Sequence, residues 1–231
     1  MSARLIVNAD DLGYDPAIDR GILEAHARGL VSAATAMVDT PFAERALAAA
    51  PATLDLGLHV VLGAGTGPAR AREEVARQLE RFRLLRGASP THLDSHRHAH
   101  LAPEVLPAFA EAALGEGIPL RATAPAVRDW LRARGVCVVD AFAGDAARRP
   151  CWTLARLVAA LESPSPGVVE LMCHPGYAPT HARTSFGPER EVELASLCDP
   201  LSRRALERGG ALLTTFAAVF SRPSGGGSAK G

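Results

Sequence analysis

The 231-residue chain has no excess of charge, because 25 basic side chains balance 25 acidic ones. Its only lysine is Lys230 and no long basic run occurs, which argues against nucleic acid or an anionic membrane surface as a partner. No apolar run is long enough to span a bilayer, and the first residues lack the basic and apolar regions of a secretory signal. These absences predict a soluble cytoplasmic protein with no integral membrane segment.

Cysteine is also scarce. The four cysteines lie far apart and form no Cys-x-x-Cys pair, so the usual sign of a cysteine-based metal or redox site is missing. We expect four separate thiols, buried in a protein of a reducing compartment.

Short apolar runs of strand length alternate with helical patterns along the chain. Asp15 and Pro16 are typical of a helix N-cap and first helical position, and Gly29 would end that helix. The strands are expected at residues 4–9, 31–38, 54–62, 91–94, 120–123, 136–139, 167–173 and 211–216. The helices are expected at residues 16–28, 41–49, 70–85, 103–115, 127–134, 153–162, 189–197 and 200–208.

This alternation predicts an α/β fold with a parallel sheet. Seven or eight such units in a chain of this length favour a (β/α) barrel, complete or irregular, with a doubly wound open sheet as the alternative. We expect a single domain over residues 1–220, followed by a flexible Gly- and Ser-rich tail at residues 221–231. In a barrel, functional side chains gather at the carboxyl ends of the strands.

Four of the chain's eight histidines occur within residues 91–100, whose sequence is THLDSHRHAH. His96, His98 and His100 cannot all be core residues without partners, because a buried imidazole must satisfy both ring nitrogens. Imidazole is a common ligand of Zn, Ni, Co and Fe, whereas carboxylate and water suit Mg and Mn. The cluster favours a metal site, and a histidine-rich surface loop is the alternative.

Three further segments place ionisable residues at or near predicted strand ends. Asp10 and Asp11 follow the first strand, where one carboxylate could bind a cation while the other takes a proton from water. The pair could instead form a turn. His59 lies in an apolar strand and could be a ligand or an ordinary core residue. His174 precedes Pro175 and could be a general acid or a turn residue.

Taken together, these motifs resemble one known family. The segments NADDLG (8–13), GLH (57–59), THLDSHRHAH (91–100) and ELMCHPGY (170–177) are similar to those of the YdjC-like carbohydrate deacetylases. That family includes the chitooligosaccharide deacetylase and the hopanoid-biosynthesis-associated deacetylase-like proteins. The resemblance extends from residue 4 to about residue 216, with the motifs in family order.

The resemblance implies an irregular barrel of the glycoside hydrolase/deacetylase superfamily that removes an N-acetyl group from an amino sugar and releases acetate. It implies a divalent metal, usually Mg, held by Asp11, His59 and His96. Zn, Ni, Co and Mn are chemically plausible with two imidazoles. Asp10 would be the catalytic base and His174 a candidate acid. The substrate would be a chitooligosaccharide or a glycolipid headgroup, and the family often forms homodimers.

Two other functions fit the same residues. One is a metal-dependent glycosidase or phosphoester hydrolase on the same barrel, although Asp10 and Asp11 are adjacent rather than placed across a scissile bond. Asp94 and Glu170 are the carboxylates that could complete a glycosidase pair. The other is a barrel that binds a sugar or metal without turnover. The roles of Arg97, His98 and His100 are left open.

Overall fold

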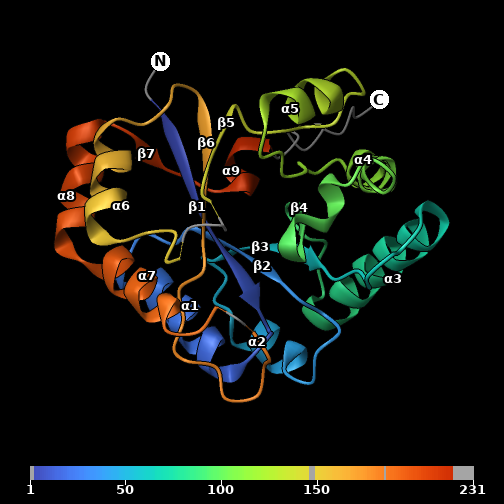
Figure 1. The fold of residues 1–231 in the computed structure, drawn as a ribbon, viewed down its shortest axis with the longest axis horizontal. Helices are drawn as coiled ribbons and strands as arrows, with labels where there is room; N and C mark the ends of the chain where they lie inside the picture. Colours follow the sequence, from blue (N-terminus) through green and yellow to red (C-terminus); the bar gives the residue numbers. More distant parts are fainter. Residues whose placement is uncertain (1–2, 146–148, 185, 221–231) are drawn as a thin grey trace, which may run out of the picture.

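Parallel strands pair through the middle of the molecule in the order β4-β3-β2-β1-β6-β5, and β7 pairs with β1 (Figure 1). The structure is a computed structural model that describes residues 3–145, 149–184 and 186–220. The tail predicted at residues 221–231 lies outside these described residues. The strands are β1 (Arg4–Leu12), β2 (Ala33–Ala36), β3 (Asp55–Val60), β4 (Leu93–Ser95), β5 (Ala141–Ala143), β6 (Val168–Cys173) and β7 (Leu212–Leu213).

The chain also forms helices, most of which lie on the outside of this curled sheet (Figure 1). They are α1 (Pro16–Arg28), α2 (Ala43–Ala49), α3 (Pro68–Arg86), η1 (His96–Leu101), α4 (Leu106–Glu116), α5 (Pro125–Arg132), α6 (Leu154–Glu162), α7 (Glu189–Cys198), α8 (Pro200–Gly209) and α9 (Phe216–Phe220). The predicted α/β fold with a parallel sheet is confirmed, and the sheet curls into an irregular, partly open barrel. None of the helices in the described part of the chain combines the length and apolarity needed to cross a membrane.

The barrel is least regular between β4 and β5. No strand forms at residues 136–139, so that prediction is wrong. The strand predicted at 120–123 is reduced to one β-bridge between Leu93 and Leu120. The backbone still connects the gap, because Leu120 N–H donates to the carbonyl of Cys137 at 3.0 Å. Pro119 has no N–H to extend this pairing. The last strand ends at Leu213 because Phe216 begins α9.

Two apolar clusters stabilise the barrel. The larger one fills the space between the sheet and its helices, where α1 buries Ile18, Ile22 and Ala25 against it. The smaller one consists of Ile6, Ala33, Val139, Val168 and Phe216. Phe216 comes from α9, whose Ala217 N–H donates to the Asp55 carboxylate at the start of β3. An apolar cluster therefore fills the amino end of the barrel beside Asp55, and the buried Asp10, Asp11 and His59 lie towards its carboxyl end.

Two local predictions had different outcomes. Asp15 is confirmed as the N-cap of α1, because its carboxylate accepts the Ala17 N–H at 2.8 Å, and Pro16 is the first helical residue. The expectation of four buried thiols is wrong for Cys137, which is exposed, and for Cys198, which is partly exposed. All four cysteines are free thiols.

Candidate metal site

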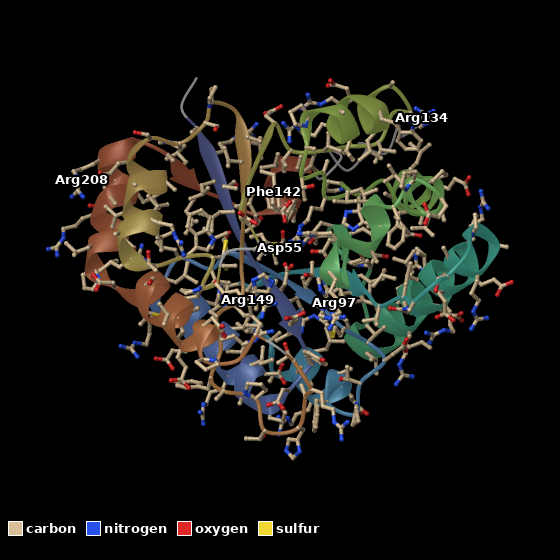
Figure 2. The ribbon with its side chains drawn as sticks, in the orientation of Figure 1. Asp55, Arg97, Arg134, Phe142, Arg149 and Arg208 are labelled. Atoms are coloured by element: carbon tan, nitrogen blue, oxygen red, sulfur yellow. The ribbon has the colours of Figure 1, made fainter. Side chains whose placement is uncertain are left out.

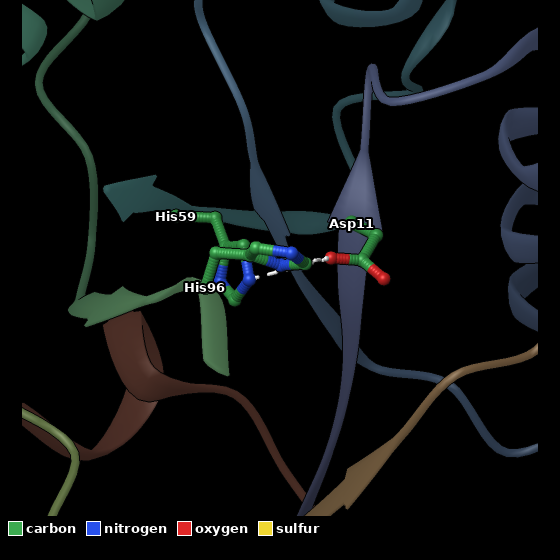
Figure 3. A group of neighbouring side chains, drawn as sticks. All are labelled: Asp11, His59 and His96. Atoms are coloured by element: carbon green, nitrogen blue, oxygen red, sulfur yellow. Dashed lines mark hydrogen bonds and ion pairs between the residues drawn. The ribbon is translucent and has the colours of Figure 1, made fainter. Parts of the chain in front are cut away.

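Three strands bring the predicted metal ligands to one place at the carboxyl end of the barrel. Asp11 lies near the end of β1, His59 near the end of β3, and His96 directly after β4 at the start of η1. One ligand atom from each lies within 4.8 Å of the others. The His59 Nε2 is 3.4 Å and the His96 Nδ1 is 3.2 Å from the same Asp11 oxygen, Oδ1 (Figure 3).

Neighbouring side chains orient these three residues. The His59 Nδ1 lies 2.6 Å from the Asp94 carboxylate, which leaves its Nε2 directed at Asp11. A carboxylate behind a histidine is the usual support of a metal-binding imidazole. Although burial alone would lower it, Asp94 and Asp11 raise the pKa of His59 to about 10. Arg190 donates to the second Asp11 oxygen at 2.5 Å.

The donor set fits a divalent cation. Asp11 supplies a carboxylate oxygen and His59 and His96 supply nitrogens, and three protein ligands leave positions open for water and substrate. A second group, Asp10 with His59 and Asp94, is equally close together. The guanidinium of Arg121 already pairs with Asp10 at 2.7 Å and Asp94 at 2.8 Å. Arg190 pairs with Asp11 through Oδ2 and leaves Oδ1 facing both imidazoles, so the Asp11 group is the better candidate.

Asp10 lies beside this group but points to a different partner. Its two carboxylate oxygens accept from Nη1 and Nη2 of Arg121, both at 2.7 Å. Burial opposes ionisation, but the Arg121 charge and hydrogen bonds hold the pKa of Asp10 well below its usual value. Asp10 is therefore ionised at neutral pH and held in one orientation.

His174 faces Asp10 from the end of β6. Its Nε2 lies 3.9 Å from Asp10 Oδ2, and its backbone N–H donates to Glu193 at 2.7 Å. The ring packs against Phe186, with centroids 5.0 Å apart. Its Nδ1 is buried and has no hydrogen-bond partner among the described residues. The geometry allows proton exchange between His174 and Asp10 after a small movement.

The histidines of residues 91–100 separate into different environments. His100 is a core residue whose ring nitrogens lie 2.7 Å from the Ser95 hydroxyl and 3.1 Å from the Arg121 carbonyl. His98 lines the pocket, and burial lowers its pKa to about 4. Arg97 and His98 both have left-handed backbones, with φ of 55° and 54°. This double turn follows His96, whose Nδ1 faces Asp11, and leaves Arg97 and His98 on the wall of the same pocket.

Two buried arginines belong to the site although the sequence analysis assigned them no role. Arg121 is 3% exposed and pairs with Asp10, Asp94 and Glu170. Arg190 is 1% exposed and lies on α7, far in sequence from its partner Asp11. The only available signal was that Arg121 follows an apolar, strand-like segment; nothing in the sequence marks Arg190.

The loop before α7 is attached to the start of α1 by Asp15. The Oδ2 atom of Asp15 accepts the backbone N–H groups of Thr180, His181 and Ala182 at 3.1, 2.7 and 2.9 Å. This loop carries Thr184 and Phe186, which line the pocket. Burial opposes ionisation, but these hydrogen bonds lower the pKa of Asp15. The ionised carboxylate therefore stabilises the fold fully at any pH above the pKa that Asp15 has in the unfolded chain. The contribution is lost as the pH falls through the lowered pKa.

We predict that Asp15→Ala will raise KM for the substrate as well as lower the thermal midpoint. The matched control is Asp199→Ala, because Asp199 caps α8 through Leu201 N–H and does not line the pocket. Each variant should lose about 1 kcal/mol of stability as a helix cap. A KM that rises equally in both variants would contradict the role of Asp15 in holding the loop.

Glu170 gives a second prediction. Burial raises its pKa to about 7 despite the Arg121 charge, and its Oε2 has no hydrogen-bond partner among the described residues. A carboxyl group whose folded pKa exceeds its unfolded value of about 4.3 destabilises the fold as pH rises between the two. Glu170→Gln should therefore raise the thermal midpoint at pH 8 relative to wild type and change it little at pH 5. A lower thermal midpoint for Glu170→Gln than for wild type at pH 8 would contradict this, because it would show that the fold favours the ionised Glu170 carboxylate.

The fold and the strand-end cluster define an α/β barrel protein with a candidate metal site, and comparison with known proteins gives the family. The model of the YdjC-like protein family matches residues 4–71 and 66–208. A carbohydrate deacetylase of Geobacillus stearothermophilus is 35% identical over 90% of this chain and 95% of its own. A chitooligosaccharide deacetylase of Serratia marcescens is 33% identical over 94% and 99%. The chain belongs to the YdjC-like family.

Solved structures show the same fold. A protein of Enterococcus faecalis V583 described as a cellobiose-phosphate cleavage protein superposes with a TM-score of 0.84 at 24% identity, and the match covers 95% of this chain and 100% of its own. A family 4 acetyl xylan esterase from Clostridium thermocellum, in complex with a cobalt ion, gives a TM-score of 0.56 at 12% identity, covering 94% and 90%. At these identities the likeness concerns the fold.

Proposed function

We propose that the protein is a metal-dependent carbohydrate deacetylase that hydrolyses the N-acetyl group of an acetylated amino sugar. The class of reaction is supported by family membership and by relatives named carbohydrate deacetylase and chitooligosaccharide deacetylase. The metal dependence rests on one observation, the convergence of Asp11, His59 and His96 within 4.8 Å.

The pocket over this group suits a sugar amide. It has a volume of about 220 Å³. Its walls include acidic, imidazole and guanidinium side chains together with Met172 and Phe186. Arg97 and Arg149 also line it, and Figure 2 shows them on either side of the carboxyl end of β1. An apolar patch beside several hydrogen-bonding groups is what a pyranose ring with polar substituents requires.

The residues around the pocket divide the proton transfers between them. A divalent cation held by Asp11, His59 and His96 would supply Lewis acidity at the acetyl carbonyl. Asp10 takes a proton from the attacking water, and Arg121 keeps its carboxylate ionised and oriented. Because this carboxylate is a weak base, the proton must move on, and His174 Nε2 is the neighbouring acceptor at 3.9 Å. His174 then protonates the leaving amine.

The arrangement of carboxylates argues against a glycosidase. Glycosidases place two carboxyl groups across the scissile bond, roughly 5–9.5 Å apart. Among the described residues that line the pocket, only Asp10 and Asp11 carry carboxylates, and they are neighbours on one strand. Asp94 and Glu170, the other two candidates, are fully buried against Arg121. Neither can act as the second glycosidase carboxylate without breaking that pairing.

The proposed reaction is tested by following two bonds in the same substrate. N-acetylglucosamine, di-N-acetylchitobiose and tri-N-acetylchitotriose would be incubated with the metal-loaded enzyme. Free acetate and new reducing ends would then be measured in parallel. We expect acetate and primary amine in equal amounts with no new reducing end. New reducing ends without acetate would instead show a glycosidase.

A further inference from the structure

The inside of the barrel contains a buried histidine, His92, that the proposed reaction does not use. It is 2% exposed and lies between the apolar cluster at the amino end and Asp10. Its ring stacks on Phe216, with centroids 3.8 Å apart and planes 18° apart. On another side it approaches Gly57, where an added Cβ would lie 2.6 Å from the ring atoms Cδ2, Cε1 and Nε2. Only glycine at position 57 leaves room for this imidazole.

His92 reaches Asp10 through one residue. Its Nε2 lies 3.0 Å from Asn8 Oδ1, and Asn8 Nδ2 donates to Asp10 Oδ1 at 3.2 Å. On the far side of the ring, Nδ1 lies 2.9 Å from the hydroxyl of Thr91. A continuous set of hydrogen bonds therefore connects Thr91 to the carboxylate that is proposed to accept the water proton.

The direction of these hydrogen bonds follows from the acceptor at their end. The ionised Asp10 carboxylate can only accept, so Asn8 must direct its amide nitrogen towards Asp10 and its amide oxygen towards His92. An amide oxygen also can only accept, so His92 must carry its proton on Nε2. Burial and the Arg121 charge lower the pKa of His92 well below its usual value, so the ring is neutral and carries its proton on Nε2. Its Nδ1 then accepts from the Thr91 hydroxyl, which lies 3.1 Å from the Leu56 carbonyl as well and can donate its one proton to only one of the two.

We propose that His92 is a positioning residue for Asp10, which it fixes by donating Nε2–H to Asn8, while Phe216 and Gly57 hold its ring in place. This role rests on the proposed function, in which Asp10 is the base. Arg121 donates to both Asp10 oxygens, Asn8 adds a donor to Oδ1, and the Thr35 hydroxyl lies farther from the same oxygen, at 3.5 Å. The proposal gives one shared role, the positioning of Asp10, to the motif residues Asn8, Gly57 and His92.

The kinetic test compares two variants of His92. His92→Phe keeps an aromatic ring against Phe216 but removes both nitrogens, whereas His92→Gln retains a side-chain N–H donor. For His92→Phe we expect kcat to fall about 10- to 100-fold, as for supporting residues of metal sites, with KM and bound metal unchanged. His92→Gln should recover most of that loss. Equal kcat values for the two variants would overturn the positioning role, because the donor would then be irrelevant.

A second measurement needs no variant. Proton–nitrogen correlation spectra of the ¹⁵N-labelled enzyme, with His92 assigned by its proximity to Phe216 ring protons, should show a neutral Nε2–H tautomer between pH 6 and pH 8. An Nδ1–H tautomer or a doubly protonated ring would overturn the proposal. This readout does not depend on turnover. Absence of acetate release by the wild-type enzyme would contradict the proposed function. The His92 tautomer would then be the only test of whether His92 donates to Asn8 and so positions Asp10.

Discussion

Asp10→Asn should retain a full complement of bound metal and lose about 10³-fold in kcat. The magnitude is within the range for removing a general base. Asp10 is not one of the three candidate ligands, and its carboxylate is bound by Arg121 rather than directed at Asp11. The substitution keeps the shape of the side chain but removes the proton acceptor. Acetate release and metal content would be measured on the same preparation.

The matched control for this variant is Asp140→Asn. Asp140 accepts the Val168 N–H at 2.8 Å at the start of β6, the opposite end of the strand from the pocket. Its loss should leave kcat unchanged. If Asp10→Asn kept wild-type turnover with metal bound, Asp10 would not be the base. If it lost metal as well, Asp10 would instead belong to the ligand set.

The largest effect on stability is expected for Arg121→Met. Arg121 is buried with Asp10, Asp94 and Glu170, all within 2.8 Å of its guanidinium nitrogens. Burial opposes its charge, but these carboxylates raise the pKa of Arg121 well above the usual value. Removing the cation leaves the carboxylates without their shared partner. Breaking a buried ion pair from one side typically costs about 3–5 kcal/mol, which urea unfolding would measure.

An exposed arginine provides the comparison. Arg208 pairs with Glu162 at 2.6 Å on the surface, where both side chains are solvent-accessible. Arg208→Met should change the free energy of unfolding by only about 0–1 kcal/mol. If Arg121→Met cost no more than Arg208→Met, the carboxylates would have to take up protons in the variant. That would contradict the expectation that loss of Arg121 leaves buried, unpaired charges that destabilise the fold.

The parts of the site that lie at strand ends were accessible from the sequence. Asp10, Asp11 and His59 belong to apolar runs whose period marks buried strands, and parallel strands bring their carboxyl ends to one edge. That rule needs no knowledge of the loops. The two predictions of regular strands that failed, at 120–123 and 136–139, concern the part of the barrel where only isolated backbone hydrogen bonds connect the chain.

The rest of the site depends on contacts that no local pattern encodes. Arg190 reaches Asp11 across 179 positions, from a helix that otherwise resembles any amphipathic surface helix. His100 satisfies its ring through Ser95 and the Arg121 carbonyl, so one member of the histidine cluster is a core residue. The left-handed backbone at Arg97 and His98 decides which histidine faces Asp11. A count of histidines could not reveal that choice.

The central claim is that the group formed by Asp11, His59 and His96 binds the metal on which deacetylation depends. Wild type and His59→Ala would be stripped with chelator and reloaded separately with Mg, Mn, Co, Ni and Zn. Bound metal and acetate release would then be measured together, with His26→Ala as a control, because the His26 ring hydrogen-bonds with the Val31 carbonyl and the Thr53 hydroxyl and does not line the pocket. We predict that stripped wild type and His26→Ala regain one metal and their activity together, while His59→Ala regains neither. Acetate release that survives stripping, or full activity in His59→Ala, would contradict the account.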